Sequence, residues 1–553
     1  MKWLRKFAIG SGLMIAGAVL MAAAFLQTQD DVYFSIKKNL SIFGALYEEI
    51  AVGYVDPVDP ERLMRTGLES MLNTLDPYTV FIDEATNEEF DIIARGRYAG
   101  VGLTVTMSDG HITVVNPIEG YSGFRQGVRA GDIIVEVDGR LVTDLSVADV
   151  SEILRGDPGS SVSLVVEREG QAQPVEFLLT REEVRLKNVT FADFIDGTSI
   201  AYIRLERFAR EAYSEVHVAI RSLARQRQID AVILDLRDNP GGFLDAAVDI
   251  SGIFLRPGTE IVSTRGRLPK THRSYRSRKS PLETELPLAI LVNGNSASAS
   301  EIVAGAIQDL DRGVVIGERT FGKGLVQIVR PLPYNTSLKL TTSKYYTPSG
   351  RSIQAITYTH RAEDGYAVVV PDSLQRVYQT AAGRQVRGGG GITPDVEITL
   401  PPISDFEEAL IRKSAFFRFA NYFAAQNPTV TENFSPSEET LKQFKNWLKS
   451  DGFVFKGRSE WLIDQLEEET ALSEYHLTSQ IEDLRLSIED EKAGDFQRYT
   501  QELTKNLRQE ILARYYGETA QIRASLAHDD QILEAVALLS DPARVKRILD
   551  GDR

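Results

Sequence analysis

Between about residue 199 and residue 400, the sequence alternates short apolar runs with longer amphipathic runs. The apolar runs have the length of buried strands, and the amphipathic runs have the spacing of helices that cover a sheet. This alternation is typical of an α/β layer, because a connection between parallel strands usually contains a helix. We therefore predict strands at residues 200–203, 231–235, 288–292 and 314–316, and helices at residues 211–227, 244–254 and 300–310.

Three further regions flank this α/β region, which we place at residues 183–402. Residues 32–95 show the apolar spacing of helices. Residues 96–182 change to short strands and glycine turns, with a helix at residues 145–154. Residues 403–553 are almost entirely charged, amphipathic helix, which is typical of a solvated helical bundle or of a dimerisation arm.

The first segment predicts export from the cytoplasm. Lys2, Arg5 and Lys6 precede an uncharged apolar run from Phe7 to Leu26. A helix of that length spans roughly 30 Å, which is enough to cross a bilayer once, and its basic flank stays cytoplasmic. We therefore predict a membrane anchor at residues 1–26. The alternative is a signal peptide that is cleaved after the small residues 22–24.

Composition excludes several classes of chemistry. The chain has 62 basic and 78 acidic residues, and its net charge of −16 argues against a general nucleic-acid binder. It has no cysteine, which excludes disulfides, zinc–thiolate sites and cysteine nucleophiles. The run Arg265 to Lys279 carries seven basic residues and no acidic one, which we interpret as a solvated loop.

Three stretches of the α/β region combine small residues with groups that can carry chemistry. Ser296, Ser298 and Ser300 lie where the strand at 288–292 joins a helix. The free N–H groups of a helix N-terminus favour a developing negative charge there. Without further information, a serine-rich helix cap is the plainer interpretation of this stretch.

The other two stretches carry a lysine and a pair of glycines. Lys323 lies between glycines ahead of an apolar strand, where loss of water favours the neutral amine that acts as a base. Gly241 and Gly242 follow the strand at 231–235 and can present N–H groups to an oxyanion. The plainer interpretation of Lys323 is a solvated surface lysine, and that of the two glycines is a simple turn.

In this order, the three stretches resemble the carboxy-terminal processing (tail-specific) serine proteases. The sequences are Asp-Leu-Arg-Asp-Asn-Pro-Gly-Gly (235–242), Ser-Ala-Ser-Ala-Ser-Glu (296–301) and Phe-Gly-Lys-Gly-Leu-Val-Gln (321–327). Residues 345–354 and 391–396 also look like this family, so the resemblance covers roughly residues 35–400. It implies a protease core similar to the ClpP/crotonase fold.

The resemblance also implies roles for individual residues. The serine and lysine of the family are 25 residues apart, which selects Ser298 as the nucleophile and Lys323 as the general base. Gln327 is implied to orient the lysine amine. Asp309 matches an acidic position of the family, and we interpret it as structural.

The oxyanion hole is implied to consist of backbone N–H groups. Ala299 would contribute one, and Gly241 or Gly242 the other, with Gly242 favoured by analogy with ClpP. No metal or cofactor is implied.

Residues 96–182 resemble a PDZ domain in two places. Residues 98–103 look like its carboxylate loop, and residues 129–139 look like a second PDZ signature. The resemblance implies that a chain-end carboxylate binds the backbone of four residues while the substrate tail adds to a sheet edge: Gly100, Val101, Gly102 and Leu103. A strand bulge is the plainer interpretation of the two glycines.

Two rival interpretations of the core are weaker. Residues 317–323 resemble a phosphate-binding loop, but Gly324 replaces the hydroxyl residue that would hold magnesium. The six histidines do not lie near a recognisable catalytic motif, which disfavours a histidine triad. Compared with shorter family members, residues 355–390 form an insertion to which the sequence assigns no role.

The expected fold is an α/β ClpP/crotonase-like protease core with an inserted PDZ-like α+β domain, an N-terminal membrane helix and a C-terminal all-helical region. The expected function is that of a membrane-tethered serine endopeptidase that cleaves envelope proteins near their C-termini. It is expected in the bacterial inner membrane with its catalytic part in the periplasm. The alternative is a membrane-anchored PDZ adaptor with an inactive or partner-gated core.

The expected partners are protein substrates with unstructured C-terminal tails and the inner membrane, without nucleic acid. The family resemblance adds a homodimer or higher oligomer and an adaptor protein to these expectations.

Overall fold

The computed structural model describes most of the chain from residue 33 to residue 551. The exceptions are residues 85–86, 88–91, 93–95, 109, 283–284, 362–366, 370, 372, 374 and 473–476. The predicted anchor at residues 1–26 therefore lies outside the described residues. Among the residues that are described, no helix combines the length and the apolarity needed to cross a bilayer.

The chain divides into two compact units, and the smaller one combines residues 1–83 with residues 328–341. Its described part contains a helix at residues 33–53, helix α2 (Pro60–Asn73) and strand β1 (Val80–Ile82). Strand β1 pairs antiparallel with the first residues of β18 (Ser337–Tyr346). The helical pattern predicted for residues 32–95 is therefore wrong at β1, where pairing with a strand far along the chain decides the structure.

The larger unit contains the predicted α/β core. Its sheet has the order β10-β11-β12-β15-β16-β23, and all its pairs are parallel except β10–β11. The strands are β10 (Val189–Phe194), β11 (Ile200–Leu205), β12 (Ala231–Asp235), β15 (Leu288–Val292), β16 (Val314–Gly317) and β23 (Val396–Glu397). The four predicted strands correspond to β11, β12, β15 and β16.

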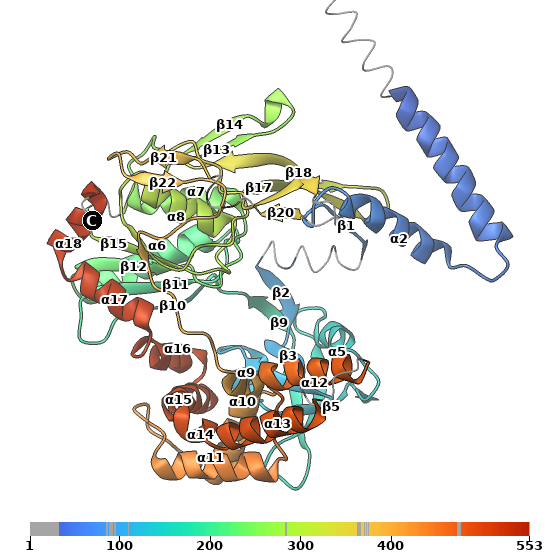
Figure 1. The fold of residues 1–553 in the computed structure, drawn as a ribbon, viewed down its shortest axis with the longest axis vertical. Coiled ribbons are helices and arrows are strands. Elements are labelled where there is room, and N and C mark those ends of the chain that lie inside the picture. Colours follow the sequence, from blue (N-terminus) through green and yellow to red (C-terminus); the bar gives the residue numbers. More distant parts are fainter. Residues whose placement is uncertain are drawn as a thin grey trace, which may run out of the picture. The chain divides into compact units, whose positions relative to one another are not determined.

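Helices cover both faces of this sheet. Alternate strand residues such as Leu234 and Ile290 pack against α6 (Ala212–Gln226), α7 (Leu244–Phe254) and α8 (Ala299–Asp309). Their neighbours Ile233 and Leu291 pack against the end of the chain, in α16 (Glu518–Leu526), α17 (Asp530–Leu539) and α18 (Pro542–Asp550). Figure 1 shows α16, α17 and α18 in red. The last three helices of the predicted C-terminal region thus complete the protease core.

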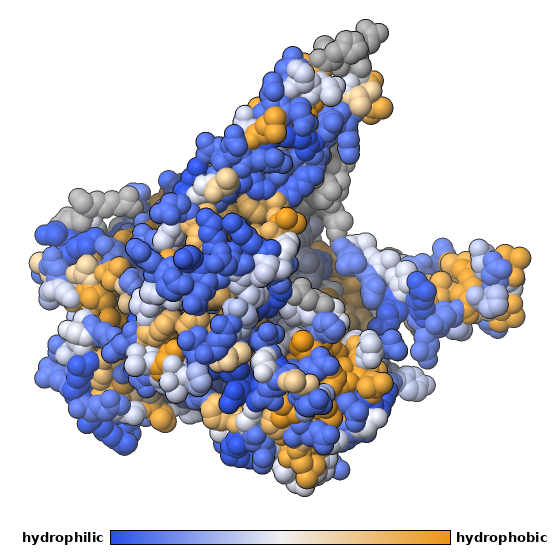
Figure 2. Space-filling model, turned by 90° about the horizontal axis from the view of Figure 1, so that it is seen from below, coloured by the Kyte–Doolittle hydropathy of each residue, from blue (hydrophilic) through white to orange (hydrophobic). Residues whose placement is uncertain are grey.

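The other helices of the C-terminal region have a separate aromatic core. These are α9 (Asp405–Arg412), α10 (Ala415–Gln426), α11 (Glu438–Ser450), α12 (Arg458–Ala471), α13 (Thr478–Ala493), α14 (Asp495–Arg498) and α15 (Thr500–Tyr516). Phe419 and Phe444 are fully buried at its centre, with ring centroids 5.0 Å apart. Figure 2 shows that the surface seen from below is mostly hydrophilic, with apolar residues in separate patches.

Residues 97–185 form an α+β domain. Its main sheet has the order β3-β4-β5-β7-β8, with β6 added to β5, so β3 is an edge strand. The strands are β3 (Leu103–Ser108), β4 (His111–Pro117), β5 (Ile133–Val137), β6 (Arg140–Leu141), β7 (Ser161–Glu167) and β8 (Val175–Thr180). Helices α4 (Ser122–Gln126) and α5 (Val147–Leu154) accompany the sheet, and β2 (Arg97–Gly100) pairs with β9 (Glu182–Arg185).

The remaining strands of the core lie outside the parallel sheet. β13 (Glu260–Arg265) and β14 (Arg273–Arg276) form a hairpin around the short helix η1 (Pro269–Thr271), and the basic run lies on this hairpin. β13 pairs with the last residues of β18, including Tyr345. β17 (Leu325–Pro331) also pairs with β18. The predicted insertion contains β19 (Ile356–Arg361), β20 (Ala367–Val369), β21 (Val377–Gln379) and β22 (Gln385–Arg387).

Candidate active site

The three serines in the turn between β15 and α8 differ in their hydrogen bonds and in their burial. The hydroxyl of Ser296 donates to the carbonyl oxygen of Leu236, and that of Ser300 donates to the carbonyl oxygen of Asn239. Both serines are fully buried, whereas Ser298 is partly exposed. Of the three, Ser298 is therefore the serine with solvent access, and its selection as the nucleophile by the family spacing stays a prediction.

The backbone of Ser298 is in an uncommon conformation. Its φ of 55° and ψ of −110° lie outside the regions that residues with a side chain prefer. Such strain persists only when the surrounding structure enforces it, and it is concentrated at functional sites. The residue immediately precedes α8, so its side chain is presented at the N-terminus of that helix.

Glu301 connects the serine turn to the loop that carries Lys323. Its fully buried carboxylate accepts hydrogen bonds from the backbone N–H groups of Ser298 (2.8 Å) and Lys323 (2.9 Å). It also accepts from the N–H of Gly322 (2.7 Å) and the hydroxyl of Thr320 (2.6 Å). One carboxylate therefore fixes the two predicted catalytic segments relative to each other.

Burial and hydrogen bonding shift the pKa of Glu301 in opposite directions. Burial disfavours the charged form and raises the pKa of Glu301 to about 6, although the bonds from Thr320, Gly322, Ser298 and Lys323 oppose this rise. All four partners are donors, which suits an ionised carboxylate. Loss of that charge therefore removes acceptor capacity from the junction of the two segments.

Further contacts hold the loop of Lys323 in place. The hydroxyl of Tyr345 lies 2.6 Å from the carbonyl oxygen of Lys323 and 3.1 Å from that of Ser298. The N–H of Gly324 donates to the side-chain oxygen of Gln354. Lys323 and Gln327 are both partly exposed, and Gln327 follows on strand β17. The even spacing of these two residues favours the same face of an extended chain.

The glycine pair after β12 lies directly against the serine turn. A Cβ atom on Gly241 would be 2.8 Å from the Cβ of Ser298 and 2.8 Å from the nitrogen of Ala299. The N–H of Gly241 donates to the side-chain oxygen of Asn239. Within the described residues, the N–H groups of Gly242 and Ala299 donate to no protein acceptor. This leaves Gly242, rather than Gly241, available as the second donor of an oxyanion hole.

Sequence reasoning missed a buried ion pair at the base of this turn. Arg237 binds the carboxylate of Asp235 at 2.6 Å, and the hydroxyl of Tyr202 donates to the same carboxylate at 2.7 Å. Arg237 also donates to Asp529 just before α17. The cluster thus links the end of β12 to the helices on the opposite face of the sheet. The charged sequence Asp-Leu-Arg-Asp, which begins at the last residue of an apolar strand, is the signal that could have indicated this cluster.

Asp309 lies at the end of α8, where its carboxylate is 2.8 Å from Arg351, and both side chains are fully buried. Asp309 also accepts a hydrogen bond from the N–H of Ser349. These contacts fit the interpretation of Asp309 as a residue that stabilises the fold.

The predicted carboxylate loop lies between β2 and the edge strand β3. Gly100 ends β2, Leu103 begins β3, and β3 contacts helix α5. Val101 is buried, and its carbonyl oxygen accepts from the N–H of Gly123. Gly102 has a φ of 74°, and a Cβ atom there would overlap the Cβ of Tyr121. The close approach explains the glycine at this position.

Comparison with known protein families gives three matches along the chain. Peptidase family S41 matches residues 199–362, and a PDZ domain matches residues 113–168. Residues 406–539 match the C-terminal helical domain of probable PDZ-proteases. The third match covers a region from which the sequence alone gave no motif.

Curated relatives align with this chain over most of their length. A carboxy-terminal-processing protease of Bartonella bacilliformis is 36% identical over 352 residues, which are 63% of this chain and 80% of that protein. A carboxyl-terminal-processing protease of Synechocystis is also 36% identical and covers 53% of this chain and 68% of its own length. A solved photosystem II D1 C-terminal processing protease is 26% identical over 64% of this chain and 92% of its own, with a TM-score of 0.34.

The family match over the core, the PDZ match and the relatives that align over most of their length all indicate the same family. The chain belongs to peptidase family S41, the carboxy-terminal processing serine peptidases with a PDZ domain.

Proposed function

We propose that this peptidase is an endopeptidase that cleaves exported proteins near their C-termini by a serine–lysine mechanism. The observation that carries the proposal is the position of Glu301, whose carboxylate binds the backbone of both Ser298 and Lys323. A shared buried acceptor keeps a nucleophile and a base in a fixed relation without contributing a proton itself.

In this mechanism, the Oγ atom of Ser298 attacks the scissile carbonyl carbon while the neutral amine of Lys323 accepts its proton. The carbonyl oxygen becomes an oxyanion that accepts hydrogen bonds from the N–H groups of Gly242 and Ala299. Collapse of the intermediate releases the amine of the C-terminal fragment, which takes the proton from Lys323. Water then hydrolyses the acyl-enzyme, and Gln327 orients the lysine amine.

The PDZ domain supplies the substrate in this proposal. In the part of the chain that the structure describes, its edge strand β3 pairs with β4 alone, so an extended tail can join its other side, next to helix α5. The backbone of residues 100–103 binds the terminal carboxylate at the start of that strand.

The proposed place of action is the outer side of the bacterial inner membrane. It rests on the apolar run from Phe7 to Leu26 behind a basic flank. The acidic balance of the chain, at a net charge of −16, fits a role without nucleic acid.

Replacing either proposed catalytic side chain should abolish cleavage. We expect Ser298→Ala and Lys323→Ala to lower kcat/KM by at least about 1,000-fold, because each removes a group that acts only in the transition state. The assay incubates the full chain with an unfolded protein that has an apolar C-terminal tail, and mass spectrometry identifies the cut sites. Ser214→Ala and Lys270→Ala, at exposed positions of the core, are the controls.

A Ser298→Ala variant that cleaves at the rate of the parent would refute the mechanism. A parent that binds the tail without cleaving it would instead support the PDZ-adaptor alternative.

The pH dependence of cleavage should reflect the protonation of both Lys323 and Glu301. Because lysine acts as a base only after losing its proton, activity should rise with pH. Below about pH 6, Glu301 also takes up a proton and loses acceptor capacity, so log kcat/KM should fall with a slope of two instead of one. A Glu301→Gln variant should be about 100-fold slower, because one amide cannot accept four hydrogen bonds, and should keep a slope of one.

The pH profiles of both proteins should be measured only where circular dichroism shows them folded. Equal slopes below pH 6 in the parent and in Glu301→Gln would contradict the positioning role of this carboxylate.

The PDZ loop should tolerate no side chain at Gly102. We expect Gly102→Ala to raise KM for a tailed substrate by about tenfold or more, because the new methyl group would displace Tyr121 and the adjacent loop. Gly110→Ala is a matched control, since Gly110 has a similar φ of 79° but no atom within 4 Å of its Cβ position. An unchanged KM in Gly102→Ala, with kcat also unchanged, would exclude this loop from tail binding.

A further inference from the structure

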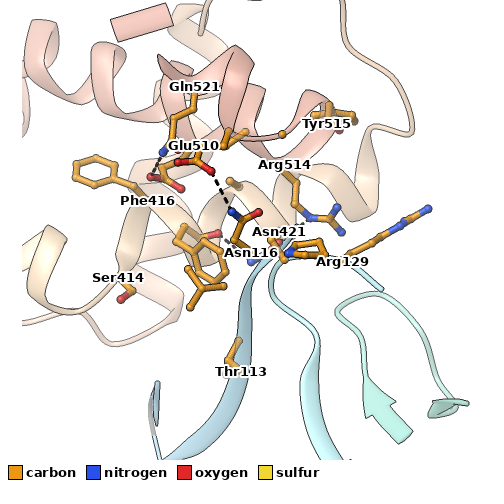
Figure 3. Close-up of a pocket in the computed structure, with 18 of the residues that line it drawn as sticks. Thr113, Asn116, Arg129, Ser414, Phe416, Asn421, Glu510, Arg514, Tyr515 and Gln521 are labelled. Atoms are coloured by element: carbon orange, nitrogen blue, oxygen red, sulfur yellow. Dashed lines mark hydrogen bonds between the residues drawn. The ribbon is translucent and has the colours of Figure 1, made fainter. Parts of the chain in front are cut away.

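A pocket of about 880 Å³ lies where the PDZ domain meets the C-terminal helical domain (Figure 3). Its walls come from β3, β4 and the loop after α4 on one side, and from α10, α15 and α16 on the other. The side chains of Phe124, Phe416 and Phe417 give it an apolar part. None of the residues proposed above for catalysis or for the carboxylate loop lines this pocket.

The two domains are closely fitted around the pocket. A Cβ atom on Gly131 of the PDZ domain would overlap the side-chain amide of Asn421 on α10. A Cβ atom on Gly170 would lie 2.8 Å from the Cβ of Ala425 on the same helix. Asn116 of β4 donates a hydrogen bond to Glu518 of α16 at 3.3 Å. The pocket is therefore a feature of a packed junction.

Arg514 extends from the last turn of α15 into this junction. Its Nε atom donates to the side-chain oxygen of Asn421 at 2.7 Å. Burial, together with the nearby positive charge of Arg129, lowers the pKa of Arg514 to about 10. A guanidinium that has lost much of its water is costly unless an anion compensates it.

The carboxylates around Arg514 form their hydrogen bonds with other residues, although the negative charge of Asp132 opposes the lowering of the pKa of Arg514. Asp132 accepts two hydrogen bonds from Arg168, at 2.7 Å each, and Glu510 accepts one from Gln521 at 3.0 Å. Glu169, on the PDZ side, is exposed. Within the described residues, neither Arg514 nor Arg129 forms an ion pair. Figure 3 shows these two arginines on one side of the pocket, away from Glu510 and Gln521.

We propose that this pocket binds an organic carboxylate, whose oxygens accept hydrogen bonds from Arg514 and Arg129 and whose apolar part lies against Phe416 and Phe417. Guanidinium groups suit this role, because their donors match the two oxygens of a carboxylate. The volume and the aromatic wall favour an organic anion over a simple inorganic one. The residues proposed for cleavage and for the carboxylate loop do not line this site, although β3 borders it.

The test measures binding of N-acetyl-phenylalaninate to the full chain by isothermal titration calorimetry at constant ionic strength. Its amide, which lacks the charge, and inorganic phosphate, which lacks the ring, are compared with it. We expect the amide and phosphate to bind at least about tenfold more weakly, and Arg514→Gln and Arg129→Gln to weaken binding of the carboxylate by a similar factor.

A matched variant separates this pocket from the carboxylate loop. Arg155 lies over the ring of Tyr98 beside that loop and does not line the pocket, so Arg155→Gln should leave binding unchanged. Loss of binding in Arg155→Gln but not in Arg514→Gln would place the probe in the carboxylate loop and overturn the proposal. Phosphate binding as tight as that of the carboxylate would overturn it as well.

The thermal midpoint without ligand distinguishes a binding role from a structural one. Arg514→Gln should unfold at the same temperature as the parent or at a higher one, because it removes a partly buried charge that forms no ion pair in the described part of the chain. A clearly lower midpoint would mean that Arg514 mainly supports the fold, and it would overturn the proposal. Arg129 is exposed, so Arg129→Gln tests ligand binding independently of folding.

Discussion

The hydrogen bonds of the Glu301 carboxylate join two segments of the proposed active site that are separate in the sequence. One segment is the strained turn of Ser298, and the other is the glycine loop of Lys323. A flexible lysine and a serine at a helix N-terminus are common features, and neither determines the position of the other. The buried carboxylate supplies that constraint, and Tyr345 reinforces it from β18. The proposed chemistry depends on this junction.

The junction in turn depends on a sheet that is covered on both faces. Strands β12 and β15 are buried along their whole length, so each needs apolar partners on two sides. Helices α6 to α8 provide one side, and α16 to α18, from the end of the chain, provide the other. Arg237 connects this second layer to the strand that precedes the glycines of the proposed oxyanion hole. Helices α16 to α18 therefore support the proposed active site from the opposite face of the sheet.

Local patterns predicted the strands and helices of the core, because apolar spacing and burial agree there. Family spacing selected Ser298 and Lys323, and the partial exposure of Ser298 beside buried Ser296 and Ser300 agrees with that choice. Contacts between distant segments could not be predicted in this way. Strand β1, the packing of α17 on the sheet and the pocket at Arg514 all arise from such contacts. The predicted ClpP/crotonase likeness and the membrane anchor stay predictions.

In the proposed mechanism, Ser298 is the nucleophile and its reactivity depends on Lys323. The most direct measurement is labelling of the full chain with a serine-reactive fluorophosphonate, followed by peptide mass spectrometry. We expect one adduct, on Ser298, that forms faster as pH rises and is lost in Lys323→Ala. An adduct on Ser296 or Ser300, or equal labelling of Ser298 without Lys323, would contradict it.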